Sequence, residues 1–175
     1  MLATAVIVVL VLVAGVLAFA ATRPDAFSVQ RSTRIKAPPE KVFALIDDFH
    51  QWTAWSPWEK IDPALNRSYS GATSGKGAVY AWKGNSKVGE GRMEILQSSP
   101  SSKILIKLDF LKPFEGHNTA EFTLESKGGF TDVTWAMYGP NRYVAKVMSL
   151  FFSMEKMVGG SFEEGLASMK VAAEN

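Results

Sequence analysis

Two histidines, His50 and His117, carry the side chains best suited to proton transfer near neutral pH. His50 follows Asp47-Asp48 at the end of a predicted helix, where a hydrogen bond or a favourable charge at the helix C-terminus explains it. His117 shares the outward face of a predicted strand with Glu121, so we expect it to face solvent. Neither histidine has a partner at the spacing that acid–base chemistry requires, and the sequence therefore predicts no catalytic residue.

The composition excludes several other kinds of site. Cysteine is absent, which rules out thiolate metal ligands and cysteine nucleophiles, and the two histidines lie too far apart in sequence to suggest a metal site. No glycine-rich phosphate motif follows a predicted strand. The net charge is +2 and no run of Lys and Arg stands out, which argues against nucleic-acid binding. We therefore expect no metal, no cofactor and no nucleic-acid partner.

Large apolar side chains are the remaining candidates for a site. Most of them share the inward face of predicted strands, and aromatic and methionine side chains suit a pocket for apolar ligands. Asn118 has the same parity as Phe122, so its amide is a candidate to orient a ligand carbonyl or to satisfy backbone at the strand end. The candidate ligand-binding residues are Trp55, Tyr80, Trp82, Met93, Phe110, Asn118, Phe122, Trp135, Met137 and Phe151. For each apolar member, simple core packing is the alternative.

The stretch "WTAWSPWEK" (52–60) holds three of the five tryptophans. Pro57 favours an extended conformation at Ser56, so a short helix carrying Trp52 and Trp55 should end before Trp58. We interpret the cluster as mainly structural, closing one end of the concave side of a sheet. Trp55 is expected to lie nearest the cavity, with Trp52 or Trp58 partly exposed. Membrane contact is the alternative, because tryptophan favours the membrane interface.

The elements that would position these residues are a set of strands between helices. "APPEKVFALIDDF" places apolar residues at helical spacing after a proline-rich start. The segment from Asn141 to about Ala173 predicts one long amphipathic helix, in which Gly159-Gly160 marks a place for a kink and Ser161 could cap a restart. Alternating apolar and polar residues predict strands at 27–36, 65–70, 77–82, 89–98, 102–110, 117–126 and 130–139. This order indicates an α+β fold, in which a curved antiparallel sheet wraps around the long C-terminal helix.

The first 21 residues, "MLATAVIVVLVLVAGVLAFAA", contain no charged side chain and are long enough to cross a bilayer as a helix. We predict a transmembrane helix at 1–22, a linker at 23–26 and one domain at 27–175. A cleaved signal peptide is the first alternative, since Ala18-Phe19-Ala20 fits the cleavage pattern, and a buried core helix is the second. Arg23 and three further basic residues follow the segment, which favours a cytoplasmic C-terminal domain beside the membrane.

The domain resembles the SRPBCC superfamily, the START-like group that includes polyketide cyclase/dehydrase and lipid-transport-like proteins. The blocks that carry the resemblance cover 27 to about 172 and are, in order, "APPEKVFALIDDFHQWTAWSPW", "YSGATSGKGAVYAWKGN", "VGEGRMEI", "DFLKPFEGHNTAEFTL" and "MEKMVGGSFEEGLASMK". The resemblance implies the helix-grip fold and a deep, mostly apolar cavity between the sheet and the C-terminal helix. It does not define an activity, because fold alone does not imply function.

Three functions are compatible with these features. The first is a membrane-anchored protein that binds a hydrophobic or lipid-like small molecule, which the anchor and the implied cavity favour. The second is a polyketide cyclase/dehydratase-like enzyme using Asn118, Tyr80 or Arg92, which only the resemblance supports. The third is a membrane-proximal protein-interaction module, marked by an exposed apolar patch around Trp52 and Trp58.

Overall fold

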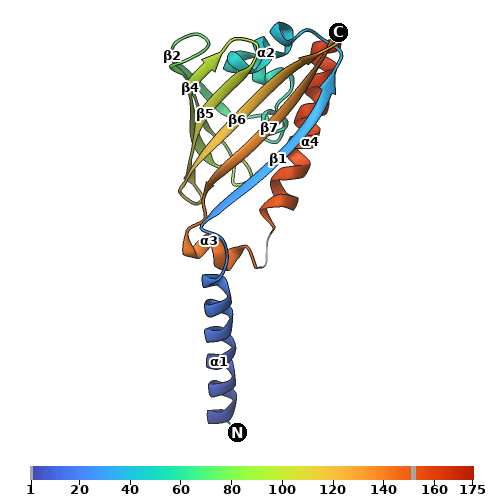
Figure 1. Ribbon diagram of the computed structural model, residues 1–175. Coiled ribbons are helices and arrows are strands. Elements are labelled where there is room, and N and C mark those ends of the chain that lie inside the picture. The colour runs from blue at the N-terminus through green and yellow to red at the C-terminus, as the bar shows by residue number, and fades with distance from the viewer. Residues whose placement is uncertain (1, 151–152) are drawn as a thin grey trace.

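The computed structural model describes residues 2–150 and 153–175, and within them seven strands form one antiparallel sheet (Figure 1). The strands are β1 (Ala26–Ile35), β2 (Asn66–Gly71), β3 (Ala78–Lys83), β4 (Glu90–Ser99), β5 (Lys103–Lys112), β6 (Gly116–Lys127) and β7 (Phe130–Pro140). The helices are α1 (Leu2–Ala21), α2 (Pro39–Asp47), α3 (Tyr143–Met148) and α4 (Met154–Glu174), with the 3₁₀ turns η1 (Phe49–Ala54) and η2 (Pro57–Lys60) after α2. Across the sheet the order is β1-β7-β6-β5-β4-β3-β2, so the first strand pairs with the last.

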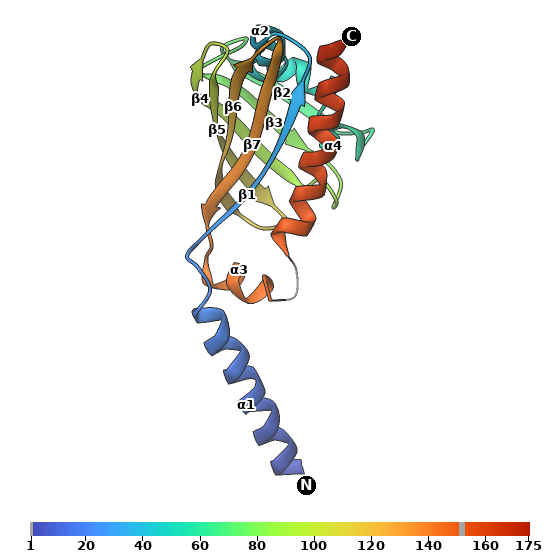
Figure 2. The ribbon, with the colours of Figure 1, turned by 45° about the vertical axis from the view of Figure 1, so that its right-hand side comes forward.

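Strict alternation divides the sheet into a buried face and a half-exposed face. In β7, for example, Val133, Trp135 and Met137 are buried, and the residues between them are only partly covered. The buried face packs against α2 and α4, and Figure 2 shows α4 running alongside β1. Phe162, Leu166 and Met169 supply the buried side of α4. The predicted α+β architecture of a curved antiparallel sheet with a long C-terminal helix is confirmed.

Two residues of the tryptophan cluster hydrogen-bond to the C-terminal end of α2. A helix leaves its last carbonyl groups without partners inside the helix. The indole N–H of Trp52 donates to the Ile46 carbonyl at 2.9 Å, and that of Trp55 donates to the Leu45 carbonyl at 2.7 Å. The two side chains therefore provide hydrogen bonds for the end of α2 as well as apolar packing, which supports the structural interpretation of the cluster.

The prediction of one helix from Asn141 to Ala173 is wrong. Helix α3 ends at Met148, and α4 begins at Met154 with Ser153 as its N-cap, whose hydroxyl accepts from the Lys156 amide. The two helices have different neighbours, because α3 packs on α1 and α4 packs on β1. The cap at the start of α4 is Ser153, whereas the sequence offered Ser161 as a residue that could cap a restart within one long helix.

Helix α1 extends away from the sheet, at the end opposite the C-terminus (Figure 1). Among the residues described, it is the one helix long and apolar enough to cross a membrane, and its apolar window is not buried in the protein. This excludes the buried core helix that the sequence left as an alternative. Pro24 lies between α1 and β1, where a proline ends the helix and lets the strand begin.

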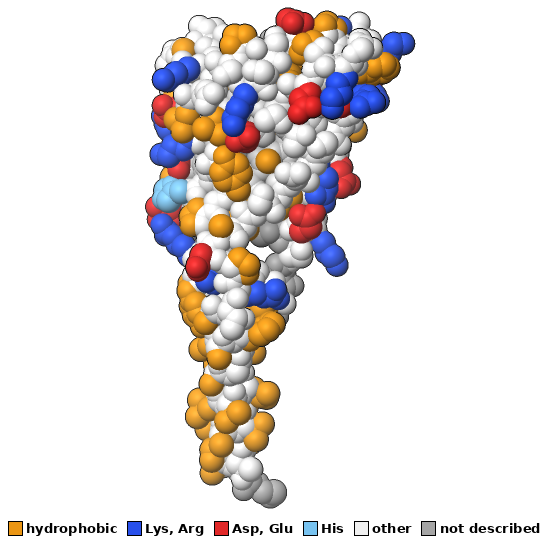
Figure 3. Space-filling view, in the orientation of Figure 1, with side chains coloured by type: hydrophobic (Ala, Val, Ile, Leu, Met, Phe, Trp, Pro, Cys, Tyr) orange, Lys and Arg blue, Asp and Glu red, His pale blue; other side chains and the backbone are white. Residues whose placement is uncertain are grey.

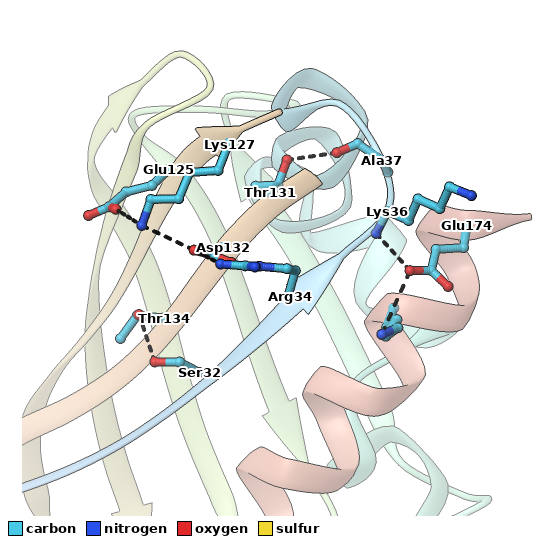
Figure 4. Close-up of polar contacts among 11 residues, drawn as sticks. Ser32, Arg34, Lys36, Ala37, Glu125, Lys127, Thr131, Asp132, Thr134 and Glu174 are labelled. Carbon is cyan, nitrogen blue, oxygen red and sulfur yellow. Dashed lines mark hydrogen bonds and ion pairs between the residues drawn. The ribbon is translucent and has the colours of Figure 1, made fainter. Parts of the chain in front are cut away.

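Polar networks on the outer face fix the end of the sheet farthest from α1. Asp132 of β7 accepts two hydrogen bonds from Arg34 of β1, and Lys127 lies 3.1 Å from the same carboxylate (Figure 4). These cations hold the pKa of Asp132 well below its usual range. Glu174 of α4 accepts the backbone N–H of Lys36 at 2.7 Å, which ties the last turn of α4 to the end of β1.

Candidate ligand-binding cavity

A cavity of about 360 Å³ lies between the buried face of the sheet, α4 and the turn η2. Its wall combines aromatic, aliphatic and a few polar side chains from all of these elements. The lining residues are Trp52, Ser56, Trp58, Glu59, Leu65, Tyr80, Trp82, Lys87, Val88, Met93, Leu108, Phe110, Ala120, Trp135, Met137, Val158, Ser161 and Phe162. The volume falls in the range of about 300–1,000 Å³ that is usual for small-molecule sites.

The sheet side of the cavity depends on one glycine. A Cβ atom at Gly91 of β4 would lie 2.3 Å from the ring of Trp82 on the neighbouring strand. Only glycine therefore allows this indole to lie across β4, where it packs edge-on to Phe110 at a centroid distance of 6.0 Å. The missing side chain at Gly91 thus shapes the wall of the cavity.

Where the sheet meets α4, the wall of the cavity is formed by stacked aromatic rings. Trp135 of β7 lies between Phe122 and Phe162, with ring centroids 4.9 and 4.0 Å away. Trp58 of η2 meets Trp135 and Phe162 edge-on, at 5.6 and 6.1 Å. The indole N–H of Trp135 is the one buried side-chain polar atom that lacks a hydrogen-bond partner in the part of the chain that the structure describes.

Glu59 places a carboxylate in this apolar wall. Only 6% of its side chain is exposed, and it accepts hydrogen bonds from Tyr80 Oη at 2.6 Å and Arg67 Nε at 2.6 Å. Burial, and then the hydrogen bond to Glu59, raise the pKa of Tyr80 far above its ordinary value. Tyr80 therefore stays protonated and acts as a hydrogen-bond donor. The three side chains form a polar cluster at one side of the cavity.

The sequence that forms this fold matches a known protein family. Residues 26–174 match the family described as polyketide cyclase / dehydrase and lipid transport. The chain belongs to this family. The SRPBCC resemblance and the helix-grip fold that it implied are confirmed over residues 26–174. A search of curated protein sequences finds no match.

Solved structures that resemble this member of the polyketide cyclase / dehydrase and lipid transport family share its fold at low identity. The di-domain ARO/CYC BexL from the BE-7585A biosynthetic pathway has a TM-score of 0.64 and 17% identity, over 90% of this chain and 53% of that one. Major latex-like protein 151 from Panax ginseng has a TM-score of 0.62 and 12% identity, over 87% and 100%. Protein CV1439 from Chromobacterium violaceum has 0.60 and 14%, over 87% and 99%. At these identities the likeness concerns the fold alone.

Six of the ten predicted ligand-binding residues line the cavity of this family member. They are Tyr80, Trp82, Met93, Phe110, Trp135 and Met137. Trp55 and Phe122 are fully buried behind the wall, because Trp55 packs edge-on against Phe122 and Trp135. The expectation that Trp55 lies nearest the cavity is wrong, since Trp52 and Trp58 line it instead.

The two remaining candidates are Asn118 and Phe151. The Asn118 amide leans over Gly139 of the next strand, whose missing side chain leaves the space, and it is not among the described lining residues. Phe151 lies outside the residues that the structure describes. Arg92, named for the enzyme alternative, pairs with Glu94 at 2.9 Å on the outer face of β4.

Glu59 and the contributions of η2 and the β3–β4 loop to the cavity wall were not predicted from the sequence. Strand parity could have found Ala120, which alternates with the buried Phe122. No periodic signal identifies Glu59, because it lies in a four-residue 3₁₀ turn. The expectation that Trp52 or Trp58 stays partly exposed is confirmed for Trp58, which is half-buried against the core. Because Trp52 is buried, the two side chains do not form the exposed patch that would mark a protein-interaction module.

Both histidines lie outside the cavity, as their predicted positions imply. His117 is on the outer face of β6, where its ring hydrogen-bonds Asp109 at 2.7 Å and Glu115 at 3.2 Å. His50 hydrogen-bonds Asp48 at 2.7 Å and stacks on Tyr69 at a centroid distance of 4.1 Å.

Proposed function

We propose that this protein binds a hydrophobic or lipid-like small molecule in the cavity and is held at a membrane by α1. The observation that carries the proposal is the aromatic and methionine-rich cavity of about 360 Å³ between the sheet and α4. A fully packed core would leave no such space, because protein interiors contain few voids larger than a water molecule. The family description, which includes lipid transport, supports the same class of ligand.

The polar groups of the wall support an amphiphilic ligand with an oxygen-bearing end. Glu59 and Tyr80 offer an acceptor and a donor beside apolar rings. The indole N–H of Trp135 has no partner but is covered by protein atoms, so it is not one of the polar groups that face the cavity.

Helix α1 supports the membrane part of the proposal. It has 20 residues, which corresponds to about 30 Å of helix and matches the hydrocarbon thickness of a bilayer. The basic residues after it favour a cytoplasmic domain. A cleaved signal peptide is the rival explanation, and N-terminal sequencing of the protein isolated from cells distinguishes the two.

Native mass spectrometry of the full chain released from detergent tests the ligand proposal. We expect a bound apolar molecule, either co-purified or added as a fatty acid, sterol or phospholipid. Ala120→Leu adds bulk to the cavity wall and should lower its occupancy about tenfold, which corresponds to 1.4 kcal/mol. Ala136→Leu is the matched control, because Ala136 alternates with Trp135 and Met137 and so lies on the outer face of the sheet.

Three results would contradict the ligand proposal. They are the absence of any adduct in the unaltered protein, equal occupancy in the two variants, and loss of binding in Ala136→Leu alone.

A cyclase- or dehydratase-like enzyme is the second candidate, and the polar cluster is the observation that favours it. Glu59 is a buried carboxylate at the cavity wall and Tyr80 is a neutral donor beside it, so the carboxylate could take a proton while the phenol donates a hydrogen bond to a developing oxyanion. Tyr80→Phe removes the donor and keeps the ring. The test is turnover of a ketone-bearing substrate. A lower turnover rate in Tyr80→Phe, with unchanged affinity for the substrate, would support the enzyme over simple binding.

A further inference from the structure

The short helix α3 has the reverse of the polarity expected of a helix in water. Its charged side chain, Lys146, is buried at 8% exposure. Its apolar side chains face outward, with Val144 71% exposed, Tyr143 46% and Met148 40%. A surface helix normally turns its apolar side chains inward and its charges outward.

Polar contacts hold α3 in this orientation at the end of α1. Lys146 Nζ pairs with Asp25 of the linker at 2.5 Å, and Asn141 Nδ2 donates to the Pro24 carbonyl at 3.1 Å. Tyr143 Oη donates to the Leu17 carbonyl in the last turns of α1 at 2.8 Å. The exposed apolar face is therefore fixed beside the helix that leaves the domain.

The apolar surface of α1 continues onto this junction, as the space-filling view shows (Figure 3). Leu17 lies four residues before the end of α1, which places the Tyr143 hydroxyl about 6 Å inside that end along the helix axis. Arg23 and Arg142 are exposed at the same junction. This combination of an aromatic hydroxyl, apolar side chains and nearby cations matches the interfacial layer of a membrane with anionic lipids.

We propose that α3 lies in the interfacial layer of the bilayer that α1 crosses, with Tyr143, Val144 and Met148 facing the lipid. This inference rests on the membrane anchor of the proposed function. It adds a second contact, which fixes the orientation of the domain on the membrane surface instead of leaving it on a flexible tether. The partner is a phospholipid bilayer, recognised by apolar insertion and by the two arginines.

Single-cysteine labelling tests this contact, because the chain contains no cysteine of its own. Val144→Cys carries an environment-sensitive fluorophore in the full-length protein, reconstituted into phosphatidylcholine–phosphatidylglycerol vesicles. We expect blue-shifted emission that spin-labelled lipid quenches and aqueous iodide does not. Val171→Cys is the matched control, because Val171 is also exposed, at 62%, but lies in the last turns of α4 at the far end of the domain (Figure 1). Its label should be quenched by iodide and not by the lipid.

The outcomes separate this inference from the anchor itself. If the protein floats with the vesicles but the Val144 label is quenched by iodide as strongly as the Val171 label, the α3 contact is overturned and the anchor stands. A Val144 label shielded from both quenchers means that protein covers α3, which also overturns the lipid contact. If the protein does not float with vesicles, the anchor fails and the α3 contact fails with it.

Discussion

At Trp55 the indole ring is fully buried and its N–H donates to the end of α2, whereas Trp58 is half-buried and meets the cavity. The two residues lie three positions apart in one short stretch. Identical side chains at regular spacing thus contribute differently, because Trp55 ends the turn η1 and Trp58 belongs to the following turn η2.

Replacing Trp55 and Trp58 in turn should separate stability from ligand binding. Trp55→Ala leaves a large void and an unpaired carbonyl, so we expect it to lower the free energy of unfolding by about 3–5 kcal/mol. Trp58→Ala should cost less stability and reduce cavity occupancy more. Urea denaturation followed by circular dichroism, with native mass spectrometry on the same samples, measures both effects. The assignment is wrong if Trp55→Ala changes binding while stability stays constant.

The pair His117–Asp109 should make stability depend on pH. The hydrogen bond to Asp109 raises the pKa of His117 above its ordinary value of 6.5. The folded state therefore binds the proton more tightly than the unfolded state. The stabilisation is complete below the ordinary pKa and is lost as pH rises through the raised pKa of the folded state.

Denaturation of the unaltered protein and of His117→Gln, compared between about pH 6 and about pH 9, measures this effect. The unaltered protein should lose its advantage over the variant across this interval. Two parallel stability curves would show that the pair contributes no pH dependence.

At the level of the elements, two glycines in α4 should respond oppositely to alanine. Gly160 has nothing within 4 Å of an added Cβ, so Gly160→Ala should stabilise the helix by about 0.5–1 kcal/mol. A Cβ at Gly165 would lie 2.8 Å from the Trp135 ring and 3.1 Å from Pro57, so Gly165→Ala should destabilise by about 1–3 kcal/mol. Thermal unfolding of the two variants compares them directly. Equal shifts of the same sign would show that α4 does not pack tightly on Trp135.

The strands were predictable because alternation is a local property of the sequence. The side-chain parity of Trp135 and Met137 predicts their inward orientation without knowledge of the pairing. The break between α3 and α4 was not predictable in the same way. Apolar spacing continues from Val144 into α4, but α3 packs on α1, and that contact joins segments more than one hundred residues apart.

The cavity was predictable only in part, for a similar reason. Inward parity marks Tyr80 and Met93 as candidates, but it cannot tell a residue that lines a space from one behind the wall, such as Phe122. That difference depends on how far α4 and η2 lie from the sheet. Glu59 reaches the wall through a 3₁₀ turn and is held there by Arg67 and Tyr80, partners that lie 8 and 21 positions away.

At the scale of the whole molecule, α1 should be separable from the fold. Deletion of residues 2–21 removes the helix and leaves intact the main hydrophobic cluster, whose members lie from β1 onward. We expect the shortened protein to remain folded, so that its circular dichroism spectrum above 200 nm differs only by the lost signal of α1. We also expect it to stop floating with vesicles. Unfolding of the shortened protein would show that α1 belongs to the core. Continued flotation would show that α3 or another surface binds the membrane without α1.

The pairing of β1 with β7 has a consequence for the order of events during synthesis. Helix α1 and β1 leave the ribosome before β7, the strand that β1 pairs with, which ends at Pro140. An α1 that enters the bilayer as it emerges holds β1 at the membrane surface, without its partner, while the five strands between them are made. Domains that fold during translation expose unpaired strand edges in this interval, when aggregation competes with folding. The proposed anchor would hold β1 at the bilayer surface through this interval, until β7 arrives and completes the sheet.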